Sequence, residues 1–77
     1  MERFKLSIKT KEDVQKILTL ANRCDGEVTA VSLDGHKRVS CSSTLAMFSM
    51  SGDAVIVEVY NQKDIDKFAR YIDEVIE

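Results

Sequence analysis

Few side chains in this chain could carry out nucleophilic, acid–base or metal chemistry. Histidine occurs once, as His36, and the two cysteines, Cys24 and Cys41, lack the Cys-x-x-Cys or Cys/His spacing that zinc sites use. No paired carboxylates, glycine-rich phosphate loop or nucleophile–base pair is evident. The sequence therefore predicts a protein that is not an enzyme and uses no metal or cofactor. We expect both cysteines to be reduced and to pack as small hydrophobic side chains.

The serine-rich stretch CSSTLAMFSMSGD, residues 41–53, offers a different chemistry. Ser42 and Ser43 precede a short apolar run that is long enough for only a few turns of helix. A serine at the start of a helix is often an N-cap, whose hydroxyl accepts a backbone N–H. A phosphate on such a serine would meet the positive end of the helix and its free N–H groups. Ser43, or Ser42 in its place, is therefore predicted to cap the helix, and the helix end would also accommodate a phosphate on Ser43.

The apolar residues of this run lie on two different arcs of the helix. Leu45 and Phe48 are three positions apart, whereas Met47 and Met50 fall on another arc. Because both pairs cannot face the same core, we expect one of them to be exposed. An exposed Leu45 and Phe48 would form an interaction patch, whereas the first helix would otherwise partly bury them.

The elements that must position these residues follow from the spacing of apolar side chains. In chain order the pattern predicts a strand over residues 3–9, a helix capped by Thr10 and ending near 22–24, strands over 27–32 and 36–41, a short helix over 43–50, a strand over 54–60 and a helix after Asn61. Apolar residues on both faces of 54–60 are typical of a central strand. The apolar stripe of the last helix comprises Ile65, Phe68, Ala69, Ile72, Val75 and Ile76.

This order predicts one α+β domain over residues 1–77. Three amphipathic helices need a sheet face to cover, which indicates two layers. We expect a four-stranded, mainly antiparallel sheet with the three helices on one face. The turn between the second and third strands is expected at Asp34-Gly35, the strongest turn signal in the chain.

The charges favour no single class of partner. Residues 1–38 contain eight Lys/Arg and six Asp/Glu, and residues 39–77 contain three and seven, so no basic stripe for nucleic acid is present. No apolar run could span a membrane or serve as a signal peptide, so we expect a cytoplasmic protein. Two groups of charged residues are expected to be solvated: His36, Lys37 and Arg38 in the turn, and Asp64, Asp66, Asp73 and Glu74 on the last helix.

The order of elements and the string KRVSCSSTLAMFSMSGDAVIVEV, residues 37–59, resemble the HPr family, the phosphocarrier proteins of the bacterial sugar phosphotransferase system. The resemblance implies an open-faced β-sandwich. It places Ser43 on the family's regulatory serine and Thr44, Leu45 and Phe48 on exposed positions that bind partner proteins. Met47 and Met50 fall on buried positions of the same short helix.

The chain departs from this family where the phosphate would be carried. The family has a histidine before the first helix, followed closely by an arginine and a proline. Here Lys9-Thr10-Lys11-Glu12-Asp13 contains none of these, and Thr10 lies near the position of the histidine. Threonine lacks the ring nitrogen that forms a phosphoimidazole. His36 is expected at the other end of a strand from Thr10.

The sequence therefore predicts an HPr-like regulatory or adaptor protein without histidine phosphotransfer. It would bind a protein, such as a kinase or a transcription regulator, through its second helix, and phosphorylation of Ser43 would regulate it. One alternative is a working phosphocarrier that uses His36. Another is a structural domain with an unrelated partner, in which Leu45 and Phe48 serve self-association. We expect a monomer, with weak dimerisation as the alternative.

Overall fold

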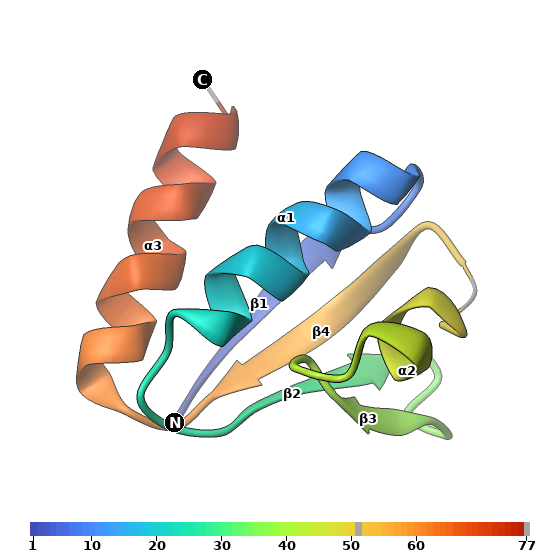
Figure 1. The fold of residues 1–77 in the computed structure, drawn as a ribbon, viewed down its shortest axis with the longest axis horizontal. Coiled ribbons are helices and arrows are strands. Elements are labelled where there is room, and N and C mark those ends of the chain that lie inside the picture. Colours follow the sequence, from blue (N-terminus) through green and yellow to red (C-terminus); the bar gives the residue numbers. More distant parts are fainter. Residues whose placement is uncertain (51, 77) are drawn as a thin grey trace.

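The computed structural model describes the backbone of residues 1–50 and 52–76 and the side chains of residues 1–50 and 52–72. The predicted order β-α-β-β-α-β-α is confirmed. The elements are β1 (Glu2–Ser7), α1 (Lys11–Asn22), β2 (Val28–Ser32), β3 (Arg38–Ser40), α2 (Thr44–Phe48), β4 (Ala54–Val59) and α3 (Gln62–Ile76) (Figure 1).

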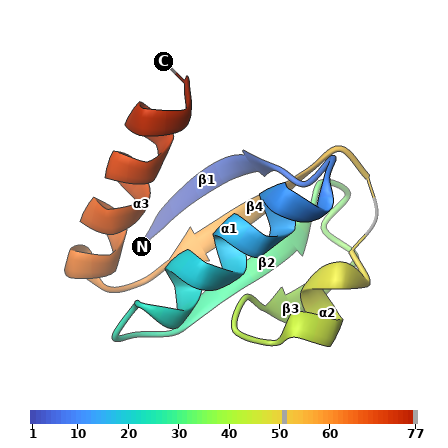
Figure 2. The same ribbon diagram turned by 45° about the horizontal axis from the view of Figure 1, so that its top comes forward.

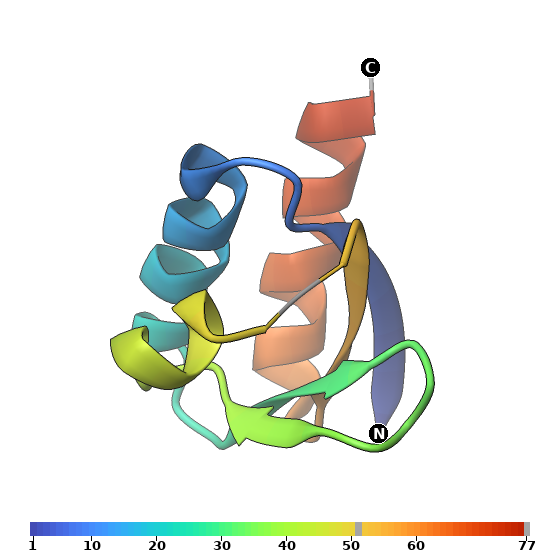
Figure 3. The same cartoon turned by 90° about the vertical axis from the view of Figure 1, so that its right-hand side faces the viewer.

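The four strands form one sheet in the order β1-β4-β2-β3, and every pairing is antiparallel. β4 is central, as its apolar residues on both faces predicted: Val55 pairs with Leu6 of β1, and Val57 pairs with Ala30 of β2. Figure 2 shows α1 lying across the sheet and α2 beside β3. In the side view of Figure 3 the helices lie on one side of the sheet, which confirms the predicted two layers.

The core lies between the helices and the inner face of the sheet. Val55, Val57 and Val59 are fully buried on that face, and the Phe4 ring stacks on Phe68 of α3 with 5.9 Å between ring centroids. The helices are amphipathic, and none in the described part of the chain has the length and apolar content needed to cross a membrane. In the apolar stripe predicted for α3, Phe68 is buried and Ile65 and Ile72 are partly buried, whereas Ala69 is exposed. The side chains of Val75 and Ile76 lie outside the described residues.

The outer face of the sheet carries a buried carboxylate. Glu58 of β4 is only 4% exposed, because Arg3 from β1 and Arg38 from β3 lie over it and form ion pairs with it. The Tyr60 hydroxyl donates a third hydrogen bond of 3.2 Å. The hydrogen bond from Arg38 lowers the pKa of Glu58, and those from Arg3 and Tyr60 add to this against the opposing effect of burial. Arg38 is exposed, as predicted, but it is the first residue of β3 and not part of the turn, and the strand directs it onto Glu58.

Replacing Glu58 by glutamine is expected to make the free energy of unfolding depend less strongly on pH. A carboxylate with a lowered folded pKa contributes stability above its pKa in the unfolded chain, and that stability is lost as the pH falls through the folded pKa. Urea unfolding at pH values between about 3 and 7 measures the effect. Glu2→Gln, at an exposed residue of the same sheet, controls for the lost charge. If wild type and Glu58→Gln lose stability in parallel on acidification, the prediction is wrong.

A second buried carboxylate joins α3 to the loop between α1 and β2. Asp64, the third residue of α3, is fully buried and accepts hydrogen bonds from the backbone N–H of Asp25 at 3.0 Å and of Gly26 at 2.8 Å. Burial alone would raise the pKa of Asp64, but these two bonds and the nearby Lys67 ammonium lower it below its ordinary value. Gly26 permits the approach, because a Cβ there would lie 3.2 Å from an Asp64 oxygen.

The predicted solvated acidic face of α3 is therefore wrong at Asp64. Asp66 is exposed, as predicted, and accepts a hydrogen bond from Gln62 at 3.2 Å. The side chains of Asp73 and Glu74 lie outside the described residues. Asp64 differs from Asp66 because it lies on the side of α3 that meets the α1–β2 loop.

Candidate functional site

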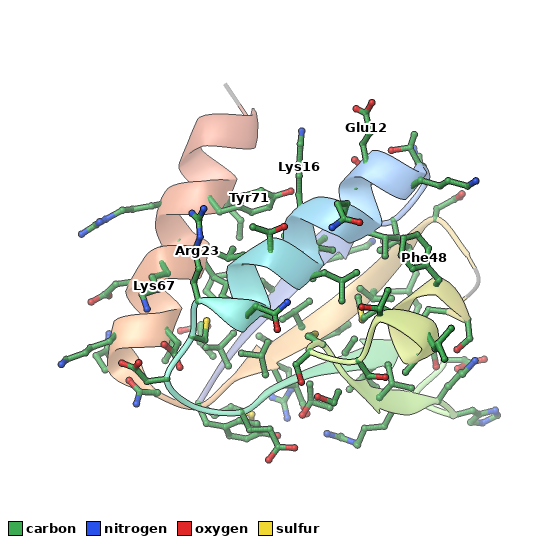
Figure 4. All side chains as sticks on the ribbon, viewed as in Figure 1. Glu12, Lys16, Arg23, Phe48, Lys67 and Tyr71 are labelled. Atoms are coloured by element: carbon green, nitrogen blue, oxygen red, sulfur yellow. The ribbon has the colours of Figure 1, made fainter. Side chains whose placement is uncertain are left out.

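The short helix α2 presents two apolar side chains to solvent. Leu45 is 87% exposed and Phe48 is 43% exposed, whereas Met47 is fully buried and Met50 nearly so. The predicted division into an outward pair and an inward pair is confirmed. Figure 4 shows the Phe48 ring pointing from α2 toward the start of α1. Leu45 and Phe48 are hereafter the α2 patch, and exposed Thr44 begins the same helix.

Contacts at both ends hold α2 in place. The Met47 N–H donates to the Ser43 carbonyl at 3.0 Å, which closes the first turn. At the other end the Lys37 ammonium, from the β2–β3 turn, donates to the Ser49 carbonyl and hydroxyl, both at 3.0 Å. A cation at a helix C-terminus satisfies its free carbonyl groups. Lys37 is exposed, as predicted, and it also anchors the helix that carries the patch.

Ser43 lies beside the α2 patch with an accessible hydroxyl. It occupies the N-cap position in an extended conformation, but its side chain makes no capping hydrogen bond. The Ser42 hydroxyl, by contrast, lies 2.9 Å from the Ser40 hydroxyl, and the Ser42 N–H donates to Ser40 Oγ at 3.3 Å. Of the two predicted roles for Ser43, side-chain capping is therefore not present, and the exposed hydroxyl is geometrically open to modification.

Thr10 has a structural role in the loop between β1 and α1. Its hydroxyl accepts the Asp13 N–H at 3.1 Å, and its own N–H donates to the Asp13 carboxylate at 3.2 Å, so the two residues form a reciprocal capping box. The Ser7 hydroxyl donates to the same carboxylate at 3.0 Å, and this bond is the main cause of the lowered pKa of Asp13. Thr10 is the predicted N-cap of α1.

His36 lies in the predicted turn, but its expected position at the other end of a strand from Thr10 is wrong. Ser7 at the end of β1 pairs with Ala54, and Ser32 at the end of β2 pairs with Val55. Both strands therefore finish beside the start of β4, at the same end of the sheet. The turn with His36 and the loop with Thr10 therefore lie at one end, separated across the sheet by β4, and not at opposite ends of a strand. The His36 N–H donates to Asp34 Oδ1 at 2.9 Å, within the predicted Asp34-Gly35 turn.

The two cysteines are free thiols. Burial raises the pKa of Cys41 to about 12. Burial, with the Asp64 charge, raises the pKa of Cys24 to about 11. Both therefore remain protonated and weakly nucleophilic near neutral pH, in agreement with their predicted packing role. Among the described residues, no three His, Cys, Asp or Glu side chains gather as they would around a metal ion.

A groove between α1 and α3, hereafter the α1–α3 groove, was not predicted from the sequence. It has a volume of about 630 Å³ and contains Leu20 and Tyr71 together with basic side chains of both helices. Lys16, Leu20 and Arg23 recur at helical spacing, as do Lys67, Arg70 and Tyr71. That spacing is a signal for a mixed basic and apolar face, but only the packing of the two helices brings the faces together.

The chain thus presents an apolar patch beside an accessible serine, and a separate basic groove. Neither arrangement contains a nucleophile held by a base within the described residues. No family model, curated protein or solved structure gives a significant match to this chain.

Proposed function

We propose that this chain is an HPr-like regulatory or adaptor protein that binds a partner protein through the α2 patch and does not transfer phosphate through histidine. The observation that carries the proposal is the 87% exposure of Leu45 on a helix whose Met47 is fully buried. The α2 helix is therefore packed against the core through Met47, while Leu45 on the same helix is exposed to solvent. The proposal places the protein in the cytoplasm with a kinase or a transcription regulator as its partner.

The energetic case is the apolar area that remains in water. Burying an exposed leucine side chain is worth about 2 kcal/mol, so a partner that covers Leu45 would recover this amount. Phe48 is already more than half covered and would add less area, but it extends the same surface toward α1 (Figure 4). Thr44 supplies a hydroxyl at the edge of the patch for hydrogen bonding to the partner.

Ser43 supplies a means of regulation at the border of the patch. A phosphate there would add a charge of about −2 one residue before α2 begins. Such a charge favours a partner with an arginine or lysine cluster and disfavours one with a purely apolar surface. The accessible hydroxyl of Ser43 supports this role, since no capping bond would have to be broken.

The capping box supports the absence of phosphocarrier chemistry. Thr10 and Asp13 form reciprocal hydrogen bonds at the position where the HPr family carries its phosphate, and Thr10 has no ring nitrogen. A working phosphocarrier would have to use His36, which lies across the sheet from that loop. Acid-labile phosphate on His36 after incubation with the first enzyme of the sugar phosphotransferase system and phosphoenolpyruvate would overturn this part of the proposal.

Photo-crosslinking in the cells that produce the chain tests the role of the patch. With the photoreactive residue p-benzoylphenylalanine in place of Leu45, we expect a covalent adduct with a second protein, identified by mass spectrometry. Phe48→Asp in the same chain should reduce the adduct about ten-fold, because it places a charge in the apolar contact. Ser43→Asp should change the yield in either direction if phosphate regulates binding.

Leu33 provides a matched control. It is a leucine that is 55% exposed in the β2–β3 turn, outside α2 and the α2 patch, and the same photoreactive residue there should give little adduct. Equal labelling from both positions would show that the α2 patch has no specific partner. An adduct composed of two copies of the chain would instead support self-association and overturn the proposed adaptor role.

A further inference from the structure

The α1–α3 groove forms where α3 diverges from α1. In Figures 1 and 3 the two helices lie side by side over the sheet without being parallel. Its volume of about 630 Å³ lies within the range of about 300–1,000 Å³ that is typical of small-molecule sites. The residues that matter for its chemistry are Lys16, Leu20 and Arg23 from the α1 side, and Lys67, Arg70 and Tyr71 from α3.

The charge of the groove is opposite to that of the chain. The whole chain has a formal net charge of −2, yet the groove contains four Lys or Arg side chains and one carboxylate, that of Glu12. Lys16 and Arg23 come from one side and Lys67 and Arg70 from the other. No ion pair joins Lys16, Arg23 or Arg70 to a carboxylate within the part of the chain whose side chains are described.

Two features give the groove an apolar floor and a fixed cation. Leu20 and Tyr71 are partly buried and pack against the core, and Figure 4 shows Tyr71 reaching from α3 toward α1 with Arg23 between the helices. The Lys67 ammonium donates to the Arg23 carbonyl at 2.7 Å and lies 3.8 Å from the Asp64 carboxylate. Lys67 is therefore held across the lower end of the groove, while Lys16 and Arg23 remain on its rim.

From this combination we propose that the α1–α3 groove binds a small organic anion, with an aromatic body against Leu20 and Tyr71 and a phosphate or carboxylate group among Lys16, Arg23 and Arg70. Guanidinium groups match the geometry of both anions. A flat apolar body suits the tyrosine ring and leucine side chain. This site is separate from the α2 patch and does not depend on the adaptor role. A bound anion would bridge α1 and α3 and stabilise their packing.

Binding of 1-naphthyl phosphate to the ¹⁵N-labelled full chain, followed by amide chemical shifts, tests the proposal. We expect saturable changes centred on Leu20, Arg23 and Tyr71. Inorganic phosphate alone and 1-naphthol alone should each bind at least about ten-fold more weakly, because each offers only half of the interaction. Raising the salt concentration should weaken the binding of naphthyl phosphate, because the rim charges are exposed to solvent.

Two variants show whether the rim charges recognise the anion. Lys16→Gln and Arg23→Gln should each weaken binding by about five-fold, since each removes one exposed charge. Lys63→Gln, on exposed α3 surface outside the groove, should leave the affinity unchanged. Unfolding in urea confirms that each variant is folded.

Three outcomes would overturn the proposal. The first is equal binding of naphthyl phosphate and 1-naphthol, which would indicate a purely apolar contact. The second is an equal loss of affinity in Lys63→Gln and Arg23→Gln, which would indicate attraction to charge in general. The third is saturable binding of a glutamate-rich helical peptide at these residues without binding of naphthyl phosphate, which would assign the groove to an acidic protein segment.

Discussion

Replacement of Asp64 by alanine is expected to lower the free energy of unfolding by about 3 kcal/mol, which is a large share of the stability of so small a domain. The carboxylate is fully buried and accepts the N–H groups of Asp25 and Gly26. Alanine would leave both donors without this partner and would detach the α1–β2 loop from the first turn of α3. Urea unfolding followed by circular dichroism measures the change, with an unchanged m-value as a sign of two-state behaviour.

Asp66→Ala is the matched control, because it removes a carboxylate from the same turn region of α3. Asp66 is exposed and bonds only to Gln62 among the described residues, so its loss should change the free energy of unfolding by less than about 0.5 kcal/mol. Similar losses in the two variants would mean that the first turn of α3 needs acidic charge in general and not the bonds of Asp64 to the loop.

Acidification should reproduce part of the effect of Asp64→Ala in the wild type. The pKa of Asp64 is lowered in the folded state, so its contribution is present above the unfolded pKa and is lost as the pH falls through the folded pKa. The difference in unfolding free energy between wild type and Asp64→Ala should therefore shrink as the pH falls below about 4. A difference that stays constant over that range would show that the charge of Asp64 does not provide the stability.

The fold could be predicted from the sequence because its main determinants are local. Thr10 caps α1, Asp34-Gly35 forms the turn, and Val55 to Val59 form a central strand, and in each case neighbouring residues supply the pattern. Helical spacing within one short segment also separates Met47 and Met50 from Leu45 and Phe48, whereas the resemblance to the HPr family implied which pair faces the core.

The features that the sequence did not show depend on contacts between distant segments. Asp64 has the usual pattern of an acidic residue in the first turn of a helix, and only its meeting with Gly26 makes it a buried acceptor. Glu58 is the one acidic residue in a valine-rich strand, which is a signal, but its partners Arg3 and Arg38 come from strands on either side. The α1–α3 groove likewise depends on the angle between the two helices, and the spacing of residues in the sequence does not determine that angle.

The short length of α2 makes Met47 the residue on which the α2 patch depends. A helix of five residues has too few internal hydrogen bonds to be stable alone, so tertiary packing must hold it. Met47 is its one fully buried side chain, and Leu45 lies two positions away with almost its whole surface in water. Met47 therefore holds α2 against the core, whereas Leu45 of the same helix is exposed to a partner.

Met47→Ala is accordingly expected to lower the free energy of unfolding by about 3 kcal/mol, because it leaves a cavity beneath α2. Leu45→Ala, which removes a similar apolar side chain from the same helix, should change it by less than about 0.5 kcal/mol because that side chain makes little contact. Urea unfolding of both variants measures the contrast, and amide hydrogen exchange should show the first loss of protection in α2 of Met47→Ala. Comparable destabilisation by both substitutions would mean that Leu45 packs against the protein itself, and the patch would then no longer be available to a partner.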